Sequence, residues 1–178
     1  MRHIMFDLET LGTKPGCPVL SFGAVAFDPY SGKLGDEFYR KLDLETELGA
    51  GRRVSAATLK WWLDQSESAR KEAFSGTVPA FIVQAEFSDF WKDQNAEFIW
   101  ANDPTFDCDV WEAAAGHVSW HFRAPRSCRT IFDLAGIWPD RTKGTFHNAL
   151  DDARNQAEAV MKCYAKLGVT HGPEGFGQ

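Results

Sequence analysis

Apolar and polar positions alternate along the first part of the chain with the period of a β-strand. In residues 2–10, apolar side chains occupy every second position, and the intervening set includes Asp7 and Glu9. Residues 18–29 form a more continuously apolar run, and residues 31–44 follow with a "DPYSG" turn at their start. Because the links between the three runs are short and rich in turn residues, we predict three strands in an antiparallel meander.

The pattern becomes helical after this meander. Ser55 is suited to cap a helix over residues 54–66, in which Leu59, Trp62 and Leu63 lie on one stripe. Further along, the predicted elements are a helix over residues 78–93, a short buried strand over 97–102, and helices over 103–116, 127–137 and 148–167. This order predicts one α/β domain in which a mixed sheet is flanked by helices.

Length and composition are consistent with one domain. The chain has 178 residues, of which 44% are hydrophobic, enough for a full core. We assign residues 1–170 to the domain and the glycine-rich residues 171–178 to a flexible tail. The four cysteines are scattered without a C-x-x-C pair, which favours reduced thiols in a cytoplasmic protein. No apolar run is long enough to span a bilayer, and the start of the chain lacks a signal-peptide pattern.

The net charge of −6 argues against a sequence-independent nucleic-acid coat, which needs a basic surface. It does not exclude an enzyme that acts on nucleic acid. Clustered carboxylates can hold divalent cations, and these reverse the local sign of the charge. The acidic residues of the chain are therefore the first place to look for chemistry.

Asp7 and Glu9 form the first acidic pair. Residues two apart on a strand point to the same face, so these carboxylates lie side by side. Their flanks are apolar, and two carboxylates on a covered sheet repel each other unless a cation lies between them. A solvent-facing acidic pair and a metal site both stay open from this stretch alone.

The second acidic stretch is "NDPTFDCD", in which Asn102 and Asp103 end a buried strand and Pro104 stops its ladder. Asp107 then falls in the first turn of the next helix. Helix capping and the helix dipole explain Asp103 and Asp109 best, and they compete with a functional role for Asp107.

The third stretch, "HNALDDARNQA", begins at His147 and opens the last predicted helix. Asn148 is a good helix cap. Residues four apart on a helix are neighbours, which favours Asp151 as the neighbour of His147. If His147 instead lies in the loop before the helix, this spacing does not apply and Asp152 can face the site. Spacing alone leaves both aspartates open.

Together, "FDLET", "NDPTFD" and "HNALDDA" resemble the three motifs of the DEDDh 3′–5′ exonucleases of the ribonuclease H-like superfamily. The motifs carry over to Asp7, Glu9, Asp107, His147 and Asp152. The stretches "SFGAVAFDPYSG", "TLKWWLDQS" and "RTIFDL" also resemble a narrower group, the short RNase T-like exoribonucleases of bacteria and phages, so the resemblance covers about residues 2–167. It implies a ribonuclease H-like mixed five-stranded sheet whose first three strands are antiparallel. One departure is Asp103, where this group is expected to have glycine.

The resemblance also implies a mechanism. Four carboxylates, those of Asp7, Glu9, Asp107 and Asp152, are expected to hold two Mg²⁺ or Mn²⁺ ions per active site. His147 is expected to be the general base, because its pKa lies near neutrality. The expected reaction is hydrolysis of single-stranded nucleic acid from its 3′ end, with RNA favoured over DNA, to release nucleoside 5′-monophosphates.

Several residues near the motifs are candidates for substrate contacts. The backbone N–H groups of Thr10 and Leu11 are expected to hold the 3′-terminal nucleotide, and Trp61 and Phe106 to stack on bases, whereas Trp62 packs in the core. The remaining expected contacts are Asn102, at the end of its strand, and Arg129 and Lys143, which are suited to phosphates although a lone basic residue is more often a solvated surface group.

Two alternatives remain at this point. One is a metal-dependent phosphohydrolase of nucleotides or short phosphodiesters, which would use the same ions. The other is a non-catalytic nucleic-acid-binding module on this fold, although a binder gains nothing from four converging carboxylates. The RNase T-like group also implies a homodimer.

Overall fold

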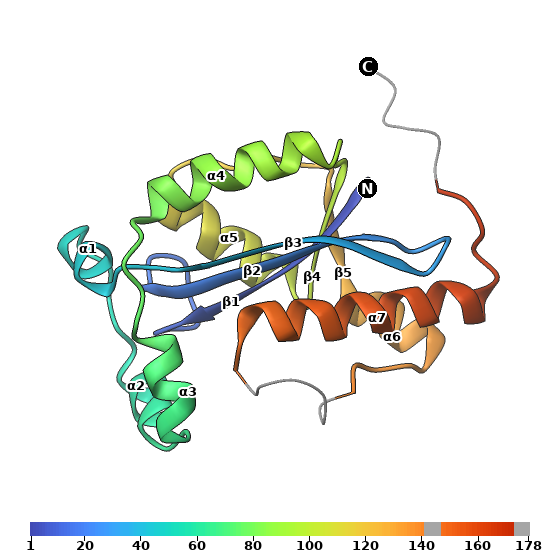
Figure 1. The fold of residues 1–178 in the computed structure, drawn as a ribbon. Helices are drawn as coiled ribbons and strands as arrows, with labels where there is room; N and C mark the ends of the chain where they lie inside the picture. The colour runs from blue at the N-terminus through green and yellow to red at the C-terminus, as the bar shows by residue number, and fades with distance from the viewer. Residues whose placement is uncertain (141–146, 173–178) are drawn as a thin grey trace.

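A five-stranded mixed sheet forms the centre of the molecule (Figure 1). The computed structural model describes residues 1–140 and 147–172. The strands are β1 (His3–Thr10), β2 (Val19–Asp28), β3 (Lys33–Lys41), β4 (Phe98–Ala101) and β5 (Pro125–Ser127), in the order β3-β2-β1-β4-β5. Strand β2 pairs antiparallel with both β1 and β3. On the other side of β1, strand β4 pairs parallel with β1, and β5 pairs parallel with β4. The predicted mixed sheet with an antiparallel first half is confirmed.

Helices cover both faces of this sheet. They are α1 (Leu44–Gly49), α2 (Ala56–Leu63), α3 (Glu67–Ala73), α4 (Ala80–Asp93), α5 (Pro104–Ala115), α6 (Cys128–Ala135) and α7 (Ala149–Leu167). In Figure 1, α4 and α5 lie on one face, α6 and α7 lie on the other, and α1, α2 and α3 extend beyond the ends of the strands.

Successive side chains of β1 point to opposite faces of the sheet and so belong to two separate core layers. Ile4, Phe6 and Leu8 pack in a cluster with residues of α4 and α5, whereas Met5 packs in a second cluster with residues of α6 and α7. Asp7 and Glu9 continue the Met5 set along the strand. Their side chains therefore lie on the face of the sheet that α7 covers.

Some elements differ from the sequence-based expectation. The hydrophobic pattern did not locate helices α1 and α3 or strand β5, and each is short, with three residues in β5. The fifth strand was expected only from the resemblance to the DEDDh exonucleases. On α2, Trp62 is buried as predicted, but Leu59 and Leu63, which were placed on the same stripe, are 39% and 61% exposed. This helix has eight residues, so it covers the core with one large ring rather than with a full apolar stripe.

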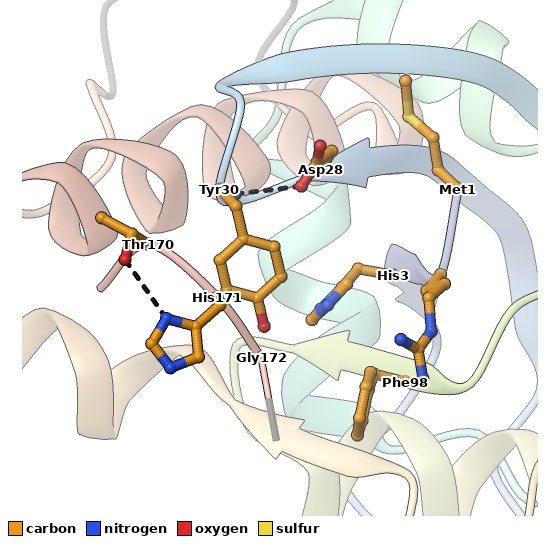
Figure 2. Close-up of a pocket in the computed structure, with 9 residues that line it drawn as sticks. Met1, His3, Asp28, Tyr30, Phe98, Thr170, His171 and Gly172 are labelled. Atoms are coloured by element: carbon orange, nitrogen blue, oxygen red, sulfur yellow. Dashed lines mark hydrogen bonds between the residues drawn. The ribbon is translucent and has the colours of Figure 1, made fainter. Parts of the chain in front are cut away.

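The segment that follows α7 lies beside the start of β1. His171 and Gly172 line a cavity of about 680 Å³ together with His3, Tyr30 and Phe98 (Figure 2). This cavity lies at the opposite end of β1 from Asp7 and Glu9. Most of the predicted tail, residues 173–178, lies outside the described residues, so its flexibility stays a prediction.

The four cysteines are all buried free thiols. Among residues 1–140 and 147–172, no helix combines the length and the apolar character that a bilayer span requires.

Candidate active site

Three carboxylates from two distant parts of the sequence converge on one face of the sheet. Asp7 and Glu9 come from β1, and Asp152 comes from the first turn of α7. One ligand oxygen from each of the three lies within 4.8 Å of the others. Glu9 is buried, whereas Asp7 and Asp152 are partly exposed, so the group remains accessible to solvent.

A glycine on β2 makes this convergence possible. Gly23 pairs with Asp7 across the β1–β2 ladder. A Cβ atom at Gly23 would lie 2.2 Å from the backbone nitrogen of Leu150 and 2.3 Å from the carbonyl carbon of Ala149. Because glycine has no Cβ, the first turn of α7 can pack directly on the strand that lies beside Asp7.

The two aspartates at the start of α7 point to different surroundings. The Asn148 side chain caps the helix by accepting from the backbone N–H groups of Leu150 and Asp151, as predicted. Asp151 forms an ion pair with Arg154 at 2.6 Å, whereas Asp152 joins the carboxylates of β1. The geometry thus places Asp152, rather than Asp151, beside Asp7 and Glu9.

Asp107 lies next to this group in the first turn of α5, where it is 3% exposed. Its Oδ2 accepts from the backbone N–H of Asp103 at 3.4 Å. Asp103 caps α5 by accepting from the backbone N–H of Thr105, so its predicted capping role is confirmed. Asp107 is not one of the three carboxylates that lie within 4.8 Å of each other, but its charge acts on Asp7.

Burial and mutual repulsion raise the pKa values of these carboxyl groups. For Asp7, burial is the largest cause, followed by the charges of its acidic neighbours, and the pKa lies well above 3.8. Burial, with the charge of Asp152, raises the pKa of Glu9 to about 8. Burial raises the pKa of Asp107 to about 7. The group therefore resists full ionisation unless a positive charge enters.

This donor set fits a divalent metal ion. Hard cations such as Mg²⁺ and Mn²⁺ select carboxylate oxygens, and here several converge from separate elements. A bound cation would also offset the repulsion that raises the pKa values of Asp7 and Glu9. The chemistry of the residues thus agrees with the divalent metals expected from the motifs.

His147 lies just before α7 in a left-handed backbone conformation, with φ of +62°. Its ring meets the edge of Trp61, with ring centroids 4.5 Å apart and planes at 84°. Burial lowers the pKa of His147 below 6.5, which favours the neutral imidazole at pH 7. A neutral imidazole can accept a proton.

Trp61 and Phe106 lie on the wall of one cavity, which has a volume of about 340 Å³. Glu9 and Thr10 also line it, so the cavity adjoins the carboxylates. Trp61 is 41% exposed, which leaves its ring accessible for stacking. Trp62, in contrast, is buried and its Nε1 donates to the carbonyl oxygen of Thr10 at 2.9 Å.

The other expected substrate contacts have different surroundings. The Leu11 backbone N–H donates to the carbonyl oxygen of Pro18 at 2.9 Å, so it is already paired and we withdraw it as a nucleotide donor. Arg129 forms an ion pair with Asp103 at 2.9 Å, although its side chain is 56% exposed. Asn102 is partly buried in the bend after β4. Lys143 lies outside the described residues.

Gln156 is a residue beside Asp7 that the sequence pattern did not reveal. Its Nε2 donates to Oδ1 of Asp7 at 2.9 Å, and its side chain is buried. The available signal was its position four residues after Asp152, because residues four apart share one face of a helix. An uncharged side chain does not stand out in a search for titratable groups.

Comparison with known proteins identifies the family of this chain and proteins of the same fold. The family model of the 3′–5′ exoribonuclease Rv2179c-like domain matches residues 2–164. An exodeoxyribonuclease of Enterobacteria phage T4 is 26% identical over 127 residues, which are 62% of this chain and 54% of the relative. The chain thus spans about half the length of that curated relative.

Two solved structures share the fold at low sequence identity. The nuclease domain of 3′hExo, a DEDDh family member bound to rAMP, is 12% identical with a TM-score of 0.62, over 98% of this chain and 96% of that one. Exonuclease X, bound to 5′-overhanging duplex DNA, is 14% identical with a TM-score of 0.58, over 93% of each chain. The fold is therefore that of the DEDDh exonucleases, and the chain belongs to the family of Rv2179c-like 3′–5′ exoribonuclease domains.

Proposed function

We propose that this chain is a metal-dependent 3′–5′ exonuclease that hydrolyses single-stranded nucleic acid, with RNA favoured, and releases nucleoside 5′-monophosphates. The observation that carries the proposal is the convergence of Asp7, Glu9 and Asp152, with ligand oxygens within 4.8 Å of each other. Family membership supports the exonuclease activity and its 3′–5′ direction.

In this proposal, Asp7, Glu9 and Asp152, with Asp107 beside them, hold two Mg²⁺ or Mn²⁺ ions. Bound ions of this kind neutralise phosphate charge, stabilise the leaving oxygen and lower the pKa of water. The protein's part is to bring the carboxylates together from β1, α5 and α7 on a rigid sheet.

His147 is the proposed general base. Its neutral imidazole takes a proton from the attacking water while the water oxygen bonds to phosphorus. The bond between that phosphorus and the 3′-oxygen of the penultimate nucleotide breaks. That oxygen takes up a proton from solvent to become a 3′-hydroxyl, and the terminal nucleotide leaves with a 5′-phosphate. The edge-on contact with Trp61, with ring centroids 4.5 Å apart, supports this role because Trp61 lines the same cavity as Glu9.

The cavity between Trp61 and Phe106 is the proposed site of the 3′-terminal nucleoside. Aromatic rings can stack on any of the bases. Glu9 lines the same cavity, so a nucleoside bound there would lie next to the carboxylates. Membership of an exoribonuclease family supports a preference for RNA. The homodimer implied by the RNase T-like group stays a prediction, which sedimentation of this 19.9 kDa chain can test.

The relative rates on RNA and DNA, and the identity of the released nucleotides, test this proposal. RNA and DNA single strands of matched sequence are incubated separately with Mn²⁺, and the released mononucleotides are identified by chromatography. We expect 5′-monophosphates from both strands and a higher initial rate on RNA. Faster DNA cleavage would reverse the sugar preference. If the chain bound Mn²⁺ but left both strands intact, its substrate would be a smaller phosphodiester.

A further inference from the structure

Gln156 has an unusual arrangement for a buried amide. It lies on α7 one turn after Asp152, and it is 8% exposed. Its Nε2 donates to Oδ1 of Asp7 at 2.9 Å. Its Oε1 is buried, and within the described part of the chain that oxygen has no hydrogen-bond partner.

Gln84 on α4 shows how a buried glutamine that only supports the fold is paired. Its Nε2 donates to the hydroxyls of Ser88 at 3.0 Å and Ser119 at 2.8 Å. Its Oε1 accepts from Nε1 of Trp111 at 2.6 Å. Both ends of this amide are satisfied, as is usual for buried polar groups. Gln156, in contrast, is paired only at the end that meets Asp7.

We infer that Gln156 is a positioning residue for metal binding: its Nε2 orients the Asp7 carboxylate, and its Oε1 is an acceptor for a cation-bound water. The inference rests on the proposed function. The negative charges of Asp107, Glu9 and Asp152 all act on Asp7, and the hydrogen bond from Gln156 holds one of its carboxylate oxygens in place. A neutral amide supplies that restraint without adding charge.

The unpaired oxygen supports this role independently. A buried acceptor without a partner costs free energy, which a donor brought by a bound ligand would recover. A cation in the carboxylate group would bring water molecules, which are strong donors. Hydrogen bonds that orient a ligand side chain commonly change metal affinity about 10–100-fold when they are removed.

Substitution Q156M tests the inference, because methionine has a similar length but no amide. Mn²⁺ binding is measured by calorimetry, and the melting temperature is measured on metal-free protein. We expect the Kd for Mn²⁺ to rise about 10–100-fold. The melting temperature should stay close to that of the wild type, because one hydrogen bond is lost and one unpaired buried oxygen is removed.

Substitution Q84M is the matched control, because it makes the same change at the fully paired glutamine. It should lower the melting temperature, since Trp111, Ser88 and Ser119 lose a partner. It should leave the Kd for Mn²⁺ at the wild-type value. Substitution Q156N, whose shorter side chain withdraws the amide from Asp7, should raise the Kd as Q156M does, and it replaces Q156M if that variant does not fold.

The outcomes separate the inference from the function on which it rests. If the wild type bound no Mn²⁺, the proposed metal site itself would be overturned. If the wild type bound Mn²⁺ and both Gln156 variants bound it equally well, only the positioning role would be overturned.

Discussion

Asp151 and Asp152 are adjacent in the sequence but perform different tasks in the structure. Asp151 pairs with Arg154, whose guanidinium also pairs with Glu37 of β3 at 2.6 Å. This network ties the start of α7 to the sheet. Asp152, one position later, faces the carboxylates of β1. The same turn of helix therefore carries both a surface ion pair and a candidate metal ligand.

The substitutions D152N and D151N should separate these tasks. We expect D152N to lower the rate of nucleotide release by roughly 10³-fold, because a charge that acts at the transition state is lost. Its metal-free form should unfold no more easily than the wild type, since one repulsive charge is gone. D151N should keep the rate and lower the free energy of unfolding by at most about 1 kcal/mol. Initial rates measure the activity, and urea unfolding measures the free energy of unfolding. Equal losses of rate in D152N and D151N would contradict the assignment.

His147 should determine the acidic limb of the pH–rate profile. In the proposed mechanism its neutral form is the base, so activity should fall as the pH drops through its pKa, which burial places below 6.5. The substitution H147Q should lower kcat by about 10²–10⁴-fold. It should also remove that limb when rates are measured at saturating Mn²⁺. A limb that persisted unchanged in H147Q would assign the titration to another group.

Single residues also show what the sequence could predict. The period of two placed Asp7 and Glu9 on one face, and the motif order selected Asp152 over Asp151. The pairing of the Leu11 N–H with Pro18 was not predictable, because it joins the two sides of a loop whose path is not a local property. Gln156 was missed for a related reason: its importance comes from its neighbour Asp7, which lies far away in the sequence.

At the scale of elements, the close packing of α7 on β2 positions the site. Gly23 is the point of contact, since a Cβ there would lie 2.2 Å from the Leu150 nitrogen. Backbone atoms cannot move aside as a flexible side chain can. A larger residue at this position must therefore displace the first turn of α7, and Asp152 with it.

The substitution G23A should lower both stability and activity. Overpacking of this kind costs about 1–3 kcal/mol, and a displacement of about 1 Å at a reacting group can cost 10²-fold in rate. The control G49A adds a methyl group at the exposed end of α1, where nothing lies within 4 Å, and should change neither quantity appreciably. Thermal melting and initial rates measure the effects. Full activity in G23A would show that α7 does not depend on this contact.

Long elements with clear periods were predictable, and short ones were not. The helices α4, α5 and α7 have 14, 12 and 19 residues, and their patterns are visible in the sequence. The helices α1 and α3 have six and seven residues, and β5 has three, too few for a period to appear. The parallel pairing of β4 with β5 depends on tertiary packing, which a local pattern does not contain.

At the scale of the whole molecule, the site stores electrostatic repulsion in the metal-free fold. The folded protein holds Glu9 at a pKa of about 8 and Asp107 at about 7, above their ordinary values of 4.5 and 3.8. Groups with raised pKa values stabilise the fold while they are protonated and lose that contribution as the pH rises through the folded pKa. Burial lowers the pKa of His3 to about 4 and also lowers the pKa of His147, so both histidines oppose this trend. Their effect above pH 6.5 is small, because a histidine in the unfolded state already loses most of its proton there.

Between pH 6.5 and 8, metal-free protein should therefore lose stability. We expect a fall in the free energy of unfolding on the order of 1–2 kcal/mol in EDTA. Saturating Mn²⁺ should cancel this fall, because a cation stabilises the ionised carboxylates. Urea unfolding at the two pH values, with and without Mn²⁺, measures the difference. The substitution E9Q should flatten the dependence in EDTA, and a stability that rose over this range would contradict the pKa assignment.

We propose that the carboxylates of β1 and α7 form a metal-dependent exonuclease site that acts from the 3′ end. The most direct test is a time course on one RNA strand, labelled in one sample at its 5′ end and in another at its 3′ end, with Mn²⁺ or with EDTA. With Mn²⁺, we predict a ladder that shortens by single nucleotides from the 3′ end, and immediate release of the 3′ label as a mononucleotide. With EDTA, both strands should stay intact. Cleavage in EDTA, internal cuts, or release of the 5′ label first would contradict the account.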